Sequence, residues 1–186
     1  MKSDVICLTE TWLLSDTPKE SLTLPGYQLH LNSNGRGKGV AMYTKSMLDQ
    51  AFIDVKREKS QITRLKTLNI DIITIYRSQA EDDTGMVREL EHMIRNNTQT
   101  VICGDINHCF VTKRGNQVTK TLQGLGFEQL IKEASHLLGG HIDHVYSNLD
   151  RSKFKVDIQM HSPYYTCHDH DAFCITITSV VDDRRK

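Results

Sequence analysis

The sequence has little of several features that would define its class at once. Among 186 residues there are three prolines, and aromatic residues make up 6%. With 11 glycines, this composition excludes fibrous and low-complexity disordered chains. No stretch approaches the roughly 20 apolar residues that a membrane span requires. Asp4 and Glu10 interrupt the segment where the core of a signal peptide would lie. We therefore expect an intracellular protein with no membrane association.

Net charge is absent as well, because 23 Lys and Arg residues balance 23 Asp and Glu residues. This excludes polycations that hold nucleic acid by net charge, but it permits a local basic groove. The five cysteines are odd in number, and three lie in or beside apolar segments. They favour reduced thiols over a disulfide framework. The length suits a single domain over residues 1–186 with a sizeable core.

Short apolar or alternating segments predict about nine strands. We expect a hairpin turn at residues 34–39, a helix that Thr84 caps and that runs to about residue 97, and short helices at residues 118–125 and 127–132. Many strands with few helices favour an α/β fold of stacked sheets flanked by helices over a regular βαβ alternation. The predicted strands cover residues 4–9, 27–31, 40–44, 50–55, 65–76 (one strand or two), 100–104, 142–147, 154–160 and 172–178.

Polar side chains stand at the ends of four of these strands. A strand end is held by a rigid sheet yet faces solvent, so it is well placed for catalysis. Asp and Asn are also frequent in turns for backbone reasons, so a single one is more simply explained as a turn residue. The combination of acid, amide and imidazole groups is what indicates a site. Its members are Glu10, Asp105, Asn107, Asp143, Asp169 and His170.

Six segments occur in a characteristic order: DVICLTETWL, GRGKGVAMYTK, ITIYRSQ, VICGDINHCF, HIDHVYSN and CHDHDAFCITI. Together they resemble the endonuclease/exonuclease/phosphatase superfamily, and within it the endonuclease domains of non-LTR retrotransposons and related mobile elements. The resemblance covers residues 4–178. It implies an α/β four-layer sandwich of two packed mixed β-sheets flanked by helices, and a metal-dependent DNA endonuclease that nicks one strand.

The resemblance also implies a role for each site residue. Glu10 is expected to bind a divalent cation, Mg²⁺ or alternatively Mn²⁺, with Asp169 beside the metal. Asp105 is expected to align or deprotonate the attacking water. This chemistry is reasonable, because Mg²⁺ takes oxygen ligands and acts as a Lewis acid on a phosphoryl oxygen.

Four more residues are expected to contact the phosphate or to support such a contact. By resemblance, Asn107 binds the scissile phosphate, and His170, oriented by Asp143, stabilises charge in the transition state. Tyr76 is expected to touch the phosphate, and Arg77 to line the same groove. A His beside a carboxylate is readily protonated near neutral pH, because the carboxylate raises its pKa.

Other interpretations of some residues stay open. A cluster of Cys167, His168, His170 and Cys174 could suggest zinc, but its spacing fits no common ligand pattern. His168 stands where the subgroup usually has Ser. The basic residues between the predicted strands at 50–55 and 65–76 are either a solvated loop or a phosphate-contacting surface: Lys56, Arg57, Lys59, Arg64 and Lys66. Trp12 is expected to pack beneath the metal site.

One departure from the superfamily pattern concerns the first strand. That strand, with an Asn near the metal, normally precedes the Glu10 motif, whereas only three residues precede DVICLTE here. We therefore expect a truncated sandwich with an open sheet edge that allows self-association. Two alternative functions follow: a weak or inactive domain that acts by binding, and a phosphatase or phosphodiesterase for a small or lipid substrate. Expected partners are DNA and, in a larger polyprotein, reverse transcriptase or helicase, in the nucleus or cytoplasm.

Overall fold

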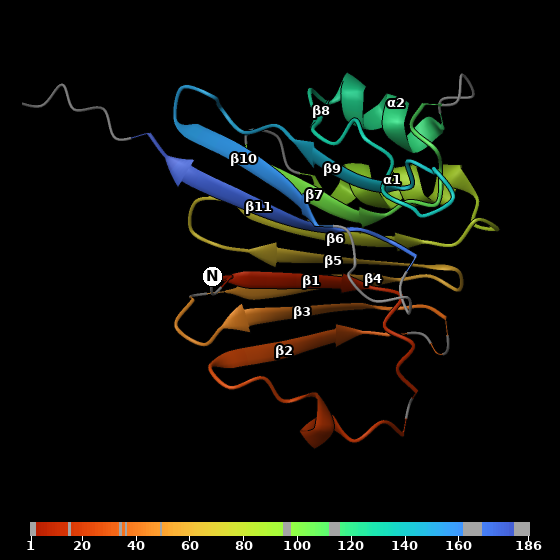
Figure 1. Ribbon diagram of the computed structural model, residues 1–186, viewed down its shortest axis with the longest axis vertical. Coiled ribbons are helices and arrows are strands. Elements are labelled where there is room, and N and C mark those ends of the chain that lie inside the picture. The colour runs from red at the N-terminus through yellow and green to blue at the C-terminus, as the bar shows by residue number, and fades with distance from the viewer. Residues whose placement is uncertain are drawn as a thin grey trace, which may run out of the picture.

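A six-stranded sheet forms the centre of the computed structural model, which describes residues 3–14, 16–33, 35, 37–48, 50–94, 98–111, 116–161 and 169–180. Its strand order is β4-β5-β6-β7-β9-β8 (Figure 1). β6 and β7 are parallel and the other neighbours antiparallel, so the sheet is mixed. The strands are β4 (Ala51–Lys56), β5 (Ser60–Lys66), β6 (Asp71–Arg77), β7 (Thr100–Asp105), β8 (Glu128–Gln129) and β9 (Asp143–Ser147).

Two smaller antiparallel sheets cover one face of this sheet. One has the order β1-β3-β2, and the other pairs β10 with β11. Val40 and Met42 of β3 pack on Leu65 and Tyr76 of the central sheet. A second apolar cluster joins β10 and β11 to β7 and β9. The strands are β1 (Val5–Thr9), β2 (Tyr27–Asn32), β3 (Val40–Lys45), β10 (Phe154–His161) and β11 (Ala172–Ser179).

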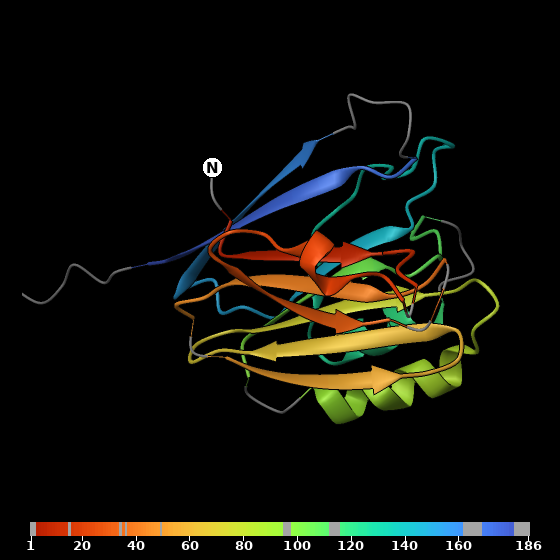
Figure 2. The same cartoon turned by 90° about the horizontal axis from the view of Figure 1, so that it is seen from below.

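Helices cover the opposite face of the central sheet. α1 (Asp83–Met93) and α2 (Gln117–Gly124) bury apolar side chains such as Leu90 and Leu122 against Ile73 and Ile102 of the sheet. Figure 2 shows α1 on one side of the central strands and the small sheets on the other. Among the described residues, no helix is long and apolar enough to span a membrane.

The predicted sandwich of packed sheets flanked by helices is confirmed, and the structure adds that its second sheet is divided in two. On the outer side of the three-stranded sheet lies the single-turn helix η1 (Lys19–Leu22), where the Tyr43 hydroxyl donates to the Leu22 carbonyl at 2.7 Å. The predicted segment 65–76 is divided between two strands, which was one of the two alternatives, but β5 already begins at Ser60, five residues earlier than predicted.

Two details of the predicted helices are wrong. Asp82, not Thr84, caps α1, because the Asp82 carboxylate accepts from the Gly85 backbone N–H at 3.4 Å. The expected extension of that helix over residues 95–97 lies outside the described residues. Residues 127–132 form no helix: β8 pairs with β9, and the Leu130 N–H donates to the Val145 carbonyl at 2.8 Å. Strand pairing outweighs local propensity there.

Candidate active site

Three neighbouring strands place three polar side chains in one row. Tyr76 of β6 is the register partner of Asp105 of β7, and Asp105 is the partner of Asp143 of β9. Residues directly opposite one another in a sheet point to the same face. Tyr76 packs in the cluster under the small sheets, so the row faces that side. The predicted strand-end residues therefore converge at one end of the sandwich.

Gly104, the residue before Asp105, allows β6 and β7 to lie close enough together to form the centre of this row. A Cβ at this position would stand 2.0 Å from the Ile75 carbonyl oxygen, and the backbone φ of 139° is one that side-chain-bearing residues rarely adopt. Only glycine allows β7 to approach β6 this closely immediately before Asp105.

Asp105 is nearly inaccessible, with 1% of its surface exposed. Asn107 holds both of its carboxylate oxygens, through its backbone N–H at 2.8 Å and its Nδ2 group at 2.7 Å. Burial and then the negative charge of Asp143 raise the pKa of Asp105 to about 7, with a further contribution from Glu10, against the lowering effects of the Asn107 N–H and His170. This carboxyl group is therefore poised to exchange a proton near neutral pH.

His170 comes from the segment just before β11 and binds Asp143, the last residue of the row. Its Nδ1 lies 2.8 Å from Asp143 Oδ2. This hydrogen bond is the main reason that the pKa of His170 rises to about 9, although partial burial opposes it. The imidazole is thus cationic at neutral pH and orients its Nε2–H away from Asp143.

Glu10 follows β1 and lies against Tyr76. Burial, followed by the charge of Glu10 and a hydrogen bond to it, raises the pKa of Tyr76 well above its usual value. Tyr76 as a whole residue is 5% exposed, and its hydroxyl also donates to the Gly37 carbonyl at 3.1 Å. Glu10, Asp105 and Asp143 thus concentrate negative charge that a divalent cation would neutralise, so this donor set fits the oxygen-ligand chemistry of Mg²⁺.

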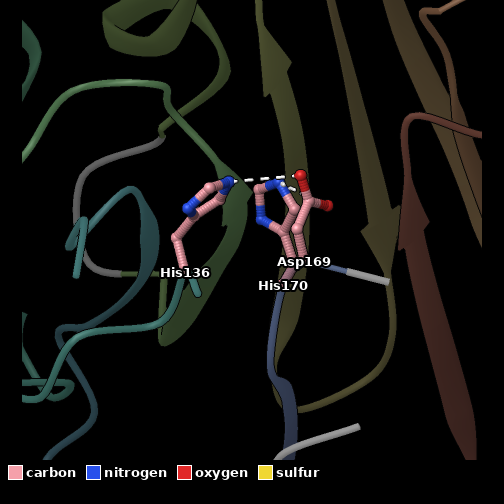
Figure 3. A group of neighbouring side chains, drawn as sticks. All are labelled: His136, Asp169 and His170. Atoms are coloured by element: carbon pink, nitrogen blue, oxygen red, sulfur yellow. Dashed lines mark ion pairs between the residues drawn. The ribbon is translucent and has the colours of Figure 1, made fainter. Parts of the chain in front are cut away.

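Asp169 contacts different residues from those around Glu10. Figure 3 shows Asp169, His170 and His136 pointing toward one another. Asp169 lies 3.3 Å from His136 Nε2 and 3.9 Å from His170 Nε2, and His136 and His170 are paired by a β-bridge. One possible ligand atom from each of these three residues lies within 4.8 Å of the other two, which is close enough for all three to bind one metal ion. However, the Leu138 backbone N–H donates to His136 Nδ1 at 3.1 Å, which leaves the proton of the neutral ring on Nε2, facing Asp169.

His136 was not among the sequence-predicted residues. Its position before a Gly-Gly turn carries no signal of its own, and only the bridge to His170 brings it to the site. Its geometry makes it a hydrogen-bond donor that holds the exposed Asp169 carboxylate. No known metal-binding spacing in the sequence could have indicated it.

Arg77 does not face the row. Successive strand residues point to opposite faces, so the neighbour of Tyr76 points toward the helices. Its guanidinium binds Asp83 of α1 at 2.7 Å and the Glu81 carbonyl at 2.6 Å, and 3% of the residue is exposed. This placement does not support the prediction that Arg77 lines the phosphate groove.

The structure also bears on the alternatives that the sequence left open. Cys167 and His168 of the zinc alternative lie outside the described residues. Arg64 of the basic stretch is a core residue that binds Asp71 and the Met93 carbonyl. The expectation that Trp12 packs beneath the site is wrong, because 54% of Trp12 is exposed.

Comparison with solved structures relates this geometry to known proteins at low sequence identity. The 3′ phosphatase NExo from Neisseria, in a mutant form bound to a product DNA hairpin, superposes with a TM-score of 0.69 and 14% identity, over 95% of this chain and 89% of that one. The catalytic domain of human Nocturnin superposes with a TM-score of 0.64 and 14% identity, over 95% of this chain and 81% of that one. The endonuclease domain of TRAS1, a telomere-specific non-LTR retrotransposon, has a TM-score of 0.60 and 14% identity, over 82% of this chain and 78% of that one. A search of curated sequences finds no match.

These likenesses show a fold that the chain shares with the three proteins. The family model described as Endonuclease/Exonuclease/phosphatase family matches residues 1–165. The chain belongs to this family, as the ordered sequence segments predicted.

Proposed function

We propose that this chain is a divalent-metal-dependent DNA endonuclease of mobile-element type, which nicks one strand by phosphodiester hydrolysis and leaves a 3′-hydroxyl. The observation that carries the proposal is Asp105, buried between Glu10 and the Asp143–His170 pair with its pKa near neutrality. Among the structural neighbours, one is a retrotransposon endonuclease domain and another holds a product DNA hairpin.

In this proposal Glu10 would hold Mg²⁺, with Mn²⁺ as the alternative, within the negative charge of Asp105 and Asp143, and Asp169 would join it from its position beside His136 and His170. When bound, the ion supplies positive charge to the phosphoryl and leaving oxygens. Asp105 takes the proton of the attacking water, and Asn107 fixes the orientation of its carboxylate. Both Nδ2 hydrogens of Asn107 are already used, by Asp105 and by the Arg77 carbonyl at 2.9 Å, so a phosphate contact would replace one of these bonds.

His170 is the proposed electrostatic partner of the phosphate. Its Nδ1–H is held by Asp143, so its Nε2–H can donate to a phosphate oxygen as negative charge develops there. Tyr76 keeps its proton at neutral pH, because burial and Glu10 raise its pKa. Its single hydroxyl proton is already shared between Glu10 and the Gly37 carbonyl, so donation to a phosphate oxygen would replace one of these bonds.

A plasmid-nicking assay tests the proposal. Supercoiled DNA is incubated with Mg²⁺ and the wild-type protein, Asp105→Asn or His170→Ala. Loss of general acid–base assistance predicts a decrease of about 100-fold or more for each variant. His92→Ala, which changes an exposed histidine on α1, is the matched control and should nick like wild type. Equal background nicking by all four proteins would reject the enzymatic proposal.

A second candidate is a binding domain that self-associates. It is favoured by the unpaired outer edges of β1 and β11, which are terminal strands of their sheets among the described residues. Such edges present free backbone N–H and C=O groups to another strand. Light scattering of the protein without DNA tests it, and a monomer with full nicking activity would exclude it.

The remaining partners follow from the same proposal. A DNA-nicking domain of this type acts in the nucleus and works beside a reverse transcriptase or helicase in a larger polyprotein. Oligonucleotides with a 3′-phosphate and phosphoinositides serve as alternative substrates in the same assay. Phosphate release from either, without DNA nicking, would assign the site to the phosphatase branch instead.

A further inference from the structure

Trp12 is the only tryptophan of the chain, and it lies two residues beyond Glu10. Tryptophan is usually well buried because of its large apolar surface. Here 54% of the residue is exposed. The Trp12 indole therefore presents part of its aromatic surface to solvent, close in sequence to the proposed metal ligand Glu10.

The backbone holds this side chain in an unfavourable conformation. The φ angles of Glu10 and Trp12 are 48° and 54°, in the left-handed region that bulky residues avoid. Such conformations persist only where the surrounding structure fixes them, and they concentrate at functional sites. Here Thr11 Oγ1 donates to the Lys38 carbonyl at 3.4 Å, and Ser33 Oγ donates to the Leu13 carbonyl at 3.3 Å. The residues on both sides of Trp12 are therefore anchored.

Gly37 lies between the Trp12 indole and Tyr76, the first residue of the row formed by Tyr76, Asp105 and Asp143. Its Cζ2 and Cη2 atoms lie 3.7 Å from the place where a Cβ of Gly37 would stand. The Gly37 carbonyl accepts the hydrogen bond from Tyr76 at 3.1 Å. Tyr76 in turn lies beside Glu10 and Asp105. The ring thus borders the place where the scissile phosphate is proposed to bind.

We propose that Trp12 is a stacking platform for a nucleobase next to the scissile phosphate, an inference that rests on DNA being the substrate. Every base has an aromatic face, so stacking on an exposed indole adds affinity without base-specific hydrogen bonds. A flat aromatic ring at the rim of a centre that binds a polyanion suits a nucleic acid better than a lipid. Replacement by Ala is expected to weaken DNA binding about 5- to 150-fold.

Because Trp12 is the sole tryptophan, its own fluorescence reports the contact. Asp105→Asn protein with Mg²⁺ is titrated with a single-stranded oligonucleotide and with the same oligonucleotide made abasic at every position. The intact strand should quench the emission to saturation, and the abasic strand should leave it nearly unchanged. Equal quenching by both strands, or quenching by phospholipid vesicles and not by DNA, would overturn the proposal.

Variants provide a second measurement that does not use fluorescence. In the nicking assay Trp12→Ala should raise KM with little change in kcat, and Trp12→Phe should restore most of the affinity because it keeps an aromatic face. Leu14→Ala is the matched control, since Leu14 is 52% exposed and lies two residues further on. An unchanged KM for Trp12→Ala in an actively nicking protein contradicts the platform. Base-dependent quenching by a protein that never nicks leaves the platform in place and rejects only the endonuclease.

Discussion

Replacement of Asp143 by Asn changes one charge beside His170 and preserves the shape of the side chain. Asp143 has 12% and His170 28% of its side-chain surface exposed, and their atoms are 2.8 Å apart. The hydrogen bond to Asp143 is the largest cause that raises the pKa of His170 from 6.5 to about 9. This difference corresponds to at most about 3 kcal/mol, because the partly exposed ring is screened by solvent.

The sign of the effect on stability follows from this raised pKa. His170 contributes its full stabilisation below its unfolded pKa of 6.5 and loses it as pH rises through about 9. Asp143→Asn should therefore lower the free energy of unfolding more at pH 6 than at pH 10. It should also lower the pKa of Asp105, because the charge of Asp143 raises it.

Two measurements test these expectations. NMR titration of the histidine signals, with His170→Gln to assign the resonance, should place the pKa of His170 near 6.5 in Asp143→Asn. Urea unfolding at both pH values gives the stability difference. If His170 still titrates near pH 9 in the variant, Asp143 is not what holds its proton, and the assigned role of the pair is wrong.

Three further predictions follow. His136→Ala should lower the nicking kcat at least about 10-fold by releasing Asp169, whereas His136→Gln keeps an N–H donor and most of the activity; equal losses for both would contradict the donor role. Bound Mg²⁺ should lower the pKa of Asp105 from about 7, so the acid limb of the pH–rate profile should move to lower pH as Mg²⁺ is raised; a limb independent of Mg²⁺ would exclude Asp105. Burial alone would raise the pKa of Asp54, but hydrogen bonds from His30 and Thr63 outweigh it and lower the pKa overall. Asp54→Asn should therefore cost up to about 1 kcal/mol at pH 7 in urea unfolding, and progressively less as the pH falls below 3.8; a loss that does not change with pH would refute the role of the carboxylate charge.

Most strand positions could be predicted because strands that bury one face show alternating residues and strands that bury both faces, such as β6, show apolar runs. The same rule assigns Tyr76 and Arg77 to opposite faces of β6, so the burial of Arg77 toward Asp83 could have been predicted as well. The two-residue strand β8 could not, since it exists only through pairing with β9. Contacts far apart in the sequence decide such short elements.

The directions in which the side chains of the site point depend on backbone conformations that no sequence pattern indicates. Among the described residues, the three non-glycine positions with left-handed φ are Glu10, Trp12 and Asn107, and all three follow a strand that ends at the proposed site. Each such conformation costs on the order of 1–3 kcal/mol for an ordinary residue. Tertiary bonds hold them, such as the paired bonds between Asn107 and Asp105. Because this support comes from distant segments, the chemistry of the site can be predicted from residue types, whereas its geometry requires the folded chain.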